Sequence, residues 1–133
     1  MASTAAVRSA LAVQLAEVLG AGVNVYAVPP DTIHAPAVVI GSIDWQDATL
    51  GGDRTSTVPL WVMVSRRNTQ FIGELDALCD PADTASVPAA INADPTLDGV
   101  VDSARVIGGG DYRDLEVGGV DHYAGTLTVE VFH

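Results

Sequence analysis

Three histidines are the side chains of this chain best suited to acid–base or metal chemistry: His34, His122 and His133. They form neither an HExxH nor a His-x-His pattern, so no two of them are spaced to bind one metal ion. His122 stands between Asp121 and Tyr123, an order that resembles an acid–base cluster. Neighbouring residues on a strand point to opposite faces, so we do not expect Asp121 and His122 to share a site. The histidine pattern therefore indicates loop or surface roles rather than catalysis.

The nucleophiles and the glycine run also lack the setting that chemistry requires. The serines are not in a GxSxG sequence between a strand and a helix, and Cys79 ends an apolar helical stripe, which predicts a buried structural thiol. The glycines at 108–110 are followed by Asp-Tyr-Arg-Asp rather than by a helix start, and the chain has no lysine. A phosphate-binding loop is therefore not expected.

Four carboxylates beyond the glycine run could offer oxygen ligands to a divalent cation: Asp111, Asp114, Glu116 and Asp121. Their spacing is not that of an EF-hand loop, and Arg113 stands among them. A solvated acidic loop is the better interpretation. We therefore expect a protein that is not an enzyme, with no catalytic residue, no cofactor and no metal site.

Size and composition predict one globular domain covering residues 1–133. The chain is long enough for one hydrophobic core, and 48% of its residues are apolar. Its longest apolar runs are far shorter than the roughly 20 residues of a membrane-spanning helix. Gln14 and Glu17 interrupt the apolar N-terminus, which therefore reads as a helix of the mature protein rather than a signal peptide. With Cys79 as the single cysteine there is no internal disulfide, and synthesis in a reducing cytoplasm is expected.

The charge is strongly acidic, because six arginines face seventeen acidic residues and give a net charge of −11. Affinity for nucleic acid is supplied largely by lysine and arginine, so ordinary nucleic-acid binding is not expected. The acidity first indicates solubility. A second interpretation is a surface past which DNA slides without adhering.

Two helices are predicted from apolar residues at helical spacing. The first is capped by Ser3 or Thr4 and ends at Gly20, and the second begins at Asn68 or Thr69. The stripe of the first helix consists of Val7, Leu11, Leu15 and Val18. The stripe of the second consists of Phe71, Ile72, Leu75, Leu78 and Cys79. A loop with one short helical turn follows, because Pro88 interrupts any longer helix.

Five strands are predicted from β-rich runs at residues 25–28, 37–43, 57–65, 99–107 and 125–132. The order α-β-β-β-α-β-β predicts an α+β fold with a mostly antiparallel sheet of about five strands, on which both helices pack. Residues 44–56 and 108–119 each read as a hairpin tip or a longer loop. The central run has apolar residues on both faces, Trp61 and Met63 lying opposite the even-numbered valines, so it is expected to be covered twice. The second cover is either another part of the chain or a neighbouring subunit.

Three segments and the N-terminal helix resemble the tail terminator (tail-completion) proteins of long-tailed bacteriophages, particularly those that infect actinobacteria. The segments are VNVYAVPPDTIHAPAVVIGS, then VPLWVMVSRR with the helix FIGELDALCD, and the closing DYRDLEVGGVDHYAGTLTVEVFH. The resemblance covers nearly the whole chain, and it rests on proline-bounded strands and helix order rather than on an invariant chemical motif.

This resemblance implies a structural subunit of the virion, assembled in the host cytoplasm. It implies a ring of identical subunits, a hexamer, at the head-proximal end of the tail tube. The ring would stop polymerisation of the major tail tube protein and join the tail to head-completion or connector proteins. Genomic DNA would pass through the lumen without specific binding, and no membrane would be involved.

The residues expected to form the interfaces belong to the central strand and to the two polar loops. They are Trp45, Asp47, Leu50, Asp53, Arg54, Trp61, Met63, Arg66, Arg67, Asp111, Tyr112, Arg113, Asp114, Leu115 and Glu116.

Other functions stay open at this point. The chain could be another neck or minor tail component of a phage. From a different class, it could be a small enzyme or ligand-binding domain with a pocket under the glycine-rich loop. A regulatory DNA mimic would also be acidic, but its carboxylates would form ordered rows, whereas those of this chain are scattered.

Overall fold

The computed structural model describes residues 3–47, 54–67 and 69–133. The helices are α1 (Thr4–Leu19), α2 (Phe71–Cys79) and α3 (Val87–Ala93). The strands are β1 (Asn24–Tyr26), β2 (Ala37–Ile40), β3 (Asp44–Asp47), β4 (Arg54–Ser65), β5 (Ser103–Val117) and β6 (Val120–Phe132). No helix of these described ranges is long and apolar enough to cross a membrane.

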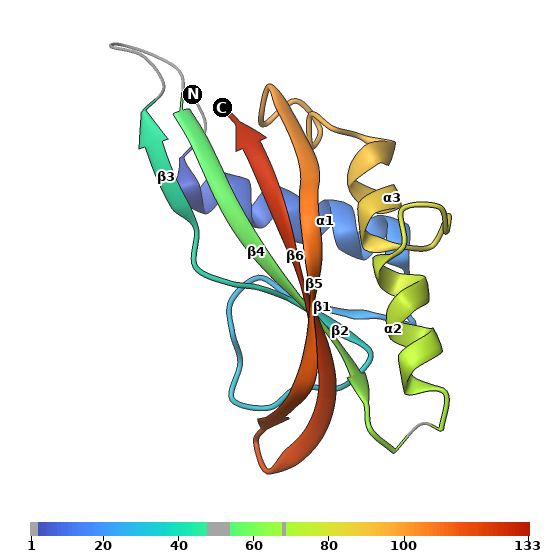
Figure 1. The fold of residues 1–133 in the computed structure, drawn as a ribbon. Helices are drawn as coiled ribbons and strands as arrows, with labels where there is room; N and C mark the ends of the chain where they lie inside the picture. The colour runs from blue at the N-terminus through green and yellow to red at the C-terminus, as the bar shows by residue number, and fades with distance from the viewer. Residues whose placement is uncertain (1–2, 48–53, 68) are drawn as a thin grey trace.

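The strands form one twisted sheet in the order β1-β2-β4-β6-β5 (Figure 1). Only β1 and β2 pair in parallel among the described strands. β2 and β3 follow one another along the same edge of β4, with Gly41 between them. A Cβ on Gly41 would lie 2.9 Å from Cγ of Pro59, so the close approach of the two backbones requires glycine. The expected α+β fold with a mostly antiparallel sheet is confirmed.

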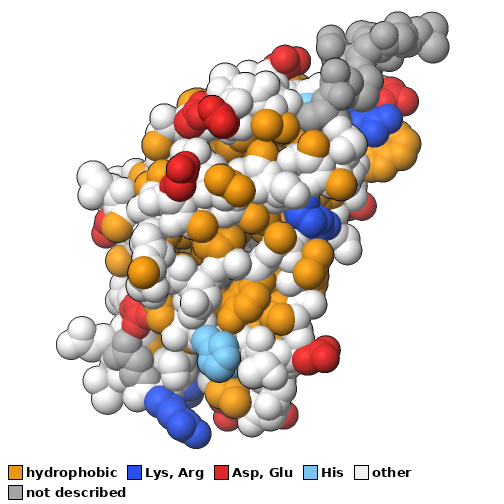
Figure 2. Space-filling view, turned by 180° about the vertical axis from the view of Figure 1, so that it is seen from behind, with side chains coloured by type: hydrophobic (Ala, Val, Ile, Leu, Met, Phe, Trp, Pro, Cys, Tyr) orange, Lys and Arg blue, Asp and Glu red, His pale blue; other side chains and the backbone are white. Residues whose placement is uncertain are grey.

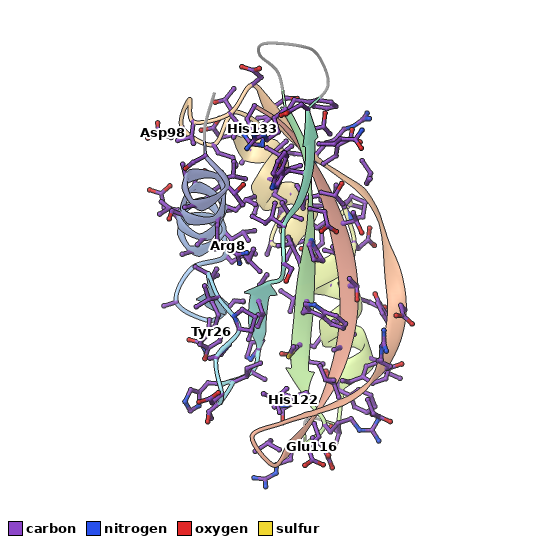
Figure 3. The ribbon with its side chains drawn as sticks, turned by 90° about the vertical axis from the view of Figure 1, so that its left-hand side faces the viewer. Arg8, Tyr26, Asp98, Glu116, His122 and His133 are labelled. Atoms are coloured by element: carbon purple, nitrogen blue, oxygen red, sulfur yellow. The ribbon has the colours of Figure 1, made fainter. Side chains whose placement is uncertain are left out.

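All three helices contribute to a core on one face of the sheet. Figure 3 looks at the opposite face, with α2 and α3 behind the strands and α1 beside them. On α1, Val7, Leu11 and Leu15 are fully buried against the sheet, as the helical spacing predicted. Val18 was expected on this stripe but is 37% exposed, because the helix turns it away near its end. Gln14 is buried instead, and its Nε2 donates to the carbonyl oxygen of Ala90 at 3.0 Å on α3.

The helix ends follow simple capping rules. The Oγ of Ser3 accepts from the amide of Ala6 at 3.1 Å, and Gly20 ends α1 with a φ of 77°. On α2, Leu75 and Leu78 are buried, as the helical stripe predicted. Ile72 is 52% exposed, so its assignment to the buried stripe was wrong. The predicted second helix starts later than expected, at Phe71, and Asn68 lies outside the described residues.

The short turn predicted around Pro88 is a complete helix, α3. Ser86 caps it by accepting from the amide of Ala89 at 3.2 Å, and Pro88 sits in the first turn. A proline is tolerated there because the first amides of a helix have no intrahelical acceptor. Pro88 therefore starts the helix rather than interrupting it.

The second face of β4 is covered by the chain itself at one end. Met63 is 4% exposed and packs in a smaller core with Ile33, Ala37, Val39 and Ala124. Ile33 comes from the loop after β1, and Leu115 and Val117 of the β5–β6 hairpin pack against this cluster. Of the two alternatives for the second cover, another part of the chain is the one observed at Met63.

β5 and β6 form a long hairpin where a long loop or an extended hairpin tip was expected. β5 runs through the glycines and carboxylates to Val117, with register shifts at Val106/Gly108 and Gly110/Arg113. The turn lies at Gly118 and Gly119. The hairpin alternative is therefore confirmed and the irregular loop is not. Glycines in a bulged edge strand tolerate the local bend that the pairing requires.

β3 is a sixth strand that the sequence did not predict. Asp44–Asp47 pairs with Thr57, Ser56, Thr55 and Arg54 in antiparallel register. All four side chains of β3 are exposed, so the strand carries no alternation of apolar and polar residues. The expected order α-β-β-β-α-β-β is corrected by one strand and one helix. Residues 44–56 were expected to form a hairpin tip or a longer loop, and α3 was expected to be a loop with one short helical turn.

Candidate interaction surface

The predicted interface residues do not form one continuous surface. Most of those that the structure describes fall into three clusters, on β3, on the open sheet face and beside α2. Met63 is buried in the smaller core, and Leu115 packs against that core with part of its side chain exposed. Arg67 and Glu116 are exposed, the latter on the hairpin (Figure 3). Leu50 and Asp53 lie outside the described residues.

The first cluster, called the edge cluster, consists of Trp45, Asp47 and Arg54. The register of β3 on β4 places the two β3 residues on one face, with Arg54 directly opposite Asp47. The Nε of Arg54 lies 3.2 Å from Oδ1 of Asp47, and its guanidinium carbon lies 4.1 Å from the centroid of the Trp45 ring. Trp45 nevertheless remains 53% exposed. The ion pair and the cation–π contact, each worth about 0.5–1 kcal/mol when exposed, hold the indole in place at the margin of the sheet.

The second cluster, on the open face of the sheet, consists of Trp61, Asp111 and Arg113. The guanidinium carbon of Arg113 lies 5.6 Å from the centroid of the Trp61 ring, and Arg113 also forms an ion pair with Asp111. These side chains border a hollow of about 520 Å³ that extends over the glycines at 108–110. The hollow exists because the glycines carry no side chains to fill it.

The third cluster joins the hairpin to α2. Arg66 lies 3.1 Å from Oδ1 of Asp114, and its guanidinium carbon lies 4.5 Å from the centroid of the Phe71 ring. Tyr123 packs edge-on against Phe71 and also against Tyr112. Burial is the main cause that raises the pKa of the Tyr112 phenol, so this hydroxyl stays protonated at neutral pH. The cluster therefore packs the hairpin against α2 and does not supply an ionised nucleophile.

One described pair has the geometry of a nucleophile and its base. The Oγ of Ser56 lies 2.6 Å from Nε2 of His133, although 77 positions separate them. Ser56 is fully buried and His133 is 4% exposed, so no substrate reaches the hydroxyl in this conformation. No local motif links the two residues, so their contact could not be predicted from the sequence.

The neighbouring side chains Asp121 and His122 lie as strand geometry predicted. His122 is 2% exposed, and its Nδ1 lies 3.0 Å from the carbonyl oxygen of Val120, while Asp121 is exposed. In the described part of the chain, no group of three or more histidine, cysteine or acidic side chains is arranged to hold a metal ion.

Several exposed apolar side chains were not predicted from the sequence. They are Val13, Val18, Val28, Ile72, Val100, Ile107, Val120 and Phe132, each at least 37% exposed. One sequence signal could have found those on α1. TAAVRSALAVQLAEVL carries apolar residues beyond its buried stripe, Val13 among them.

Comparison with known proteins gives little. No protein-family model matches the sequence, and no curated protein matches it. Among solved structures, a chain of the virion of a native gene transfer agent particle is similar at 17% sequence identity and a TM-score of 0.40. The match covers 95% of this chain and 94% of that chain.

Proposed function

We propose that this chain is a structural virion assembly protein of the tail terminator type. It forms a ring at the head-proximal end of a phage tail tube, stops the tube polymerising and joins the tail to head or neck proteins. The sequence resemblance described above supports this proposal. No enzymatic step is assigned to the chain.

The observation that carries the proposal is the exposed edge strand β3. A free strand edge presents unpaired backbone groups and is a ready site for association. Trp45 projects from this edge with half of its surface exposed, held by Arg54. Tryptophan and arginine are the side chains most enriched at the energetic centres of interfaces. The edge cluster is therefore the best candidate for a contact with another subunit or with the tube.

A ring also needs a second, different surface on each subunit, because head-to-tail contacts join unlike patches. β3 and β5 lie at opposite margins of the sheet, separated by β4 and β6. The hollow beside Trp61 and Arg113 lies next to the β5 margin. Contacts from the edge cluster of one copy to the β5 margin of the next would be heterologous and could close into a ring.

The acidic charge fits this role. The ion pairs of the described residues occupy Arg54, Arg66, Arg105 and Arg113, while the acids outnumber the arginines almost threefold. In the proposed ring, acids on the channel would repel the phosphate backbone and let DNA pass. A basic lumen would contradict this explanation of the charge without contradicting the ring.

Native mass spectrometry of the purified chain, alone and with the major tail tube protein of the same phage, tests the proposal. We expect a closed ring, with the hexamer as the main species. Trp45→Ala should weaken assembly at least about tenfold, as expected at an energetic centre. Ile72→Ala is the matched control, because Ile72 is equally exposed but lies on α2. A strict monomer that never binds the tube protein would overturn the proposal.

Deletion of the gene in the phage supplies the functional readout. Tails of uncontrolled length, seen by electron microscopy, are expected if the protein terminates the tube. Tails of normal length that fail to join heads would favour a different neck component.

A second candidate function is ligand binding in a different hollow, which lies on the helix side of the glycines at 108–110. This hollow of about 460 Å³ lies between β5 and the helices α2 and α3, and is lined by Pro81, Pro88 and Leu127 among others. Its polar groups include the Cys79 thiol and the Tyr112 hydroxyl, and burial raises the pKa of both. Arg105 and Asn92 also line the hollow, so it offers both polar and apolar contacts to a ligand. Saturable binding of a fluorescent apolar dye that Cys79→Phe abolishes would support this alternative.

A further inference from the structure

A groove beside α1 has no role in the fold or in the proposed ring. It runs between α1 and the turn at residues 94–100, with a volume of about 520 Å³. Val13 and Val100 border it and are 60% and 37% exposed. Figure 2 shows the molecule from the side on which α1 lies, where hydrophobic side chains spread across the face and acidic side chains lie along its margins.

Apolar side chains of α1 lie on the groove side as well as on the side that faces the sheet. The stripe of Val7, Leu11 and Leu15 already buries one side of the helix against the sheet. Val13 and the small side chains of Ala6 and Ala10 lie on the groove side. Ser9, Gln14 and Glu17 line the same side, so the α1 wall of the groove combines apolar and polar side chains and suits a segment that has both.

The turn that forms the other wall is held in one conformation. The carboxylate of Asp94 accepts from the hydroxyl of Thr96 at 2.7 Å and from the amide of Asp98 at 2.8 Å. Leu97, at the centre of the turn, is 1% exposed and anchors it to the core. A partner therefore meets a preformed wall and does not have to order it.

The charge around the groove is negative and is not neutralised by the chain. Glu17, Asp94 and Asp98 line it, and none of them takes part in the ion pairs found among the described residues. Arg8 is the arginine of α1, but its guanidinium donates to the carbonyl oxygens of Ala27, Ile40 and Gly41 on the other side of the helix. The arginine of α1 is therefore not placed to neutralise these carboxylates.

We propose that this groove binds an amphipathic segment of a partner protein in which apolar side chains are flanked by lysine or arginine. The apolar side chains would cover Val13 and Val100, and the basic ones would pair with the carboxylates. A second copy of the chain is a poor occupant, because it carries a net charge of −11 and no lysine. The proposal does not depend on ring formation, and a protein that proves monomeric can still bind such a segment.

Nuclear magnetic resonance can test this with a defined probe. A 14-residue peptide of leucine and lysine, patterned as an amphipathic helix, is titrated into the ¹⁵N-labelled protein at physiological salt. We expect saturable shifts of the amides in residues 6–17 and 94–100. The same peptide with glutamate in place of lysine should cause none.

Two pairs of variants separate a groove from general attraction to an acidic protein. Val13→Asp should weaken binding at least about tenfold, because it buries an unpaired charge. Val28→Asp changes the net charge equally at a side chain of equal exposure elsewhere, and should have little effect. Asp98→Asn should weaken binding more than Asp121→Asn on the hairpin, and the difference should shrink as salt is added.

The outcomes that overturn the proposal are specific. Equal affinities for Val13→Asp and Val28→Asp would show that the attraction is not located in the groove. Shifts centred on other residues, or no binding at millimolar peptide, would do the same.

Discussion

The Oγ of Ser56 lies 2.6 Å from Nε2 of His133, and this contact fastens the last residue of the described chain to the first part of β4. Two backbone hydrogen bonds between Arg54 and His133, of 2.8 and 2.9 Å, continue the pairing to the same end. Both side chains are buried, in a position where a polar group needs a partner. The pair therefore stabilises the end of the sheet from which β3 and Trp45 project.

Ser56→Ala should destabilise the protein by about 1–3 kcal/mol, because the buried imidazole loses a hydrogen-bond partner. The loss is measured as a lower free energy of unfolding in urea. Ser42→Ala is the control, since Ser42 is exposed and should change stability little. If Ser56→Ala were as stable as the original protein, the contact would not be structural.

Met63→Ala tests whether this side chain belongs to the smaller core or to an interface. Burial among Ile33, Val39 and Ala124 predicts that the isolated protein loses about 2–5 kcal/mol of stability on truncation. Urea unfolding of the unassembled protein gives the value. An interface residue would instead leave the isolated chain nearly unchanged and weaken only assembly.

Much of the fold could be predicted because burial leaves a periodic pattern. Leu127, Val129 and Val131 alternate along β6, and Val7, Leu11 and Leu15 recur along α1, so both elements were recognised. β3 was missed for the same physical reason. Its residues are exposed on both faces, so its pairing with β4 leaves no trace in the order of apolar residues.

The interaction surfaces were less predictable, because they depend on which distant residues meet. The sequence suggested that Trp45 and Arg54 share a polar loop, and the strand register brings them into contact. It could not show that Ser56 meets His133, nor that a turn at residues 94–100 lies beside Val13. Pairings of this kind are fixed by sheet topology and helix packing rather than by local spacing.

Gly118→Ala should destabilise the hairpin tip by about 1–2 kcal/mol, because Gly118 has a φ of 60° that other residues adopt at a cost. An added Cβ would also lie 2.9 Å from the carbonyl oxygen of Asp31, in the loop that covers the smaller core. Gly22→Ala is a matched control with open space around it and no such φ. Equal stability of the two variants in thermal unfolding would mean that the tip does not pack on this loop.

Asp94 gives the chain a defined dependence on pH. The hydrogen bond from the hydroxyl of Thr96 is the main cause that lowers the pKa of the Asp94 carboxyl below its ordinary value, and the amide of Asp98 adds to it. A lowered pKa in the folded state stabilises the fold above the unfolded pKa of about 4, and the contribution is lost as the pH falls through the folded value. The wall of the α1 groove should therefore loosen in acid.

The measurement follows amide hydrogen exchange at residues 96–98 between neutral pH and pH about 3, corrected for the intrinsic pH dependence of exchange. We expect protection in the original protein to fall across this acidic range. Asp94→Asn should show low protection throughout, whereas Asp83→Asn, in a comparable turn near α3, should leave these amides unchanged. Because the turn forms one wall of the groove, binding of the leucine–lysine peptide should weaken over the same acidic range. Protection that does not change with pH would show that the ionised carboxylate of Asp94 does not hold this wall of the groove in place.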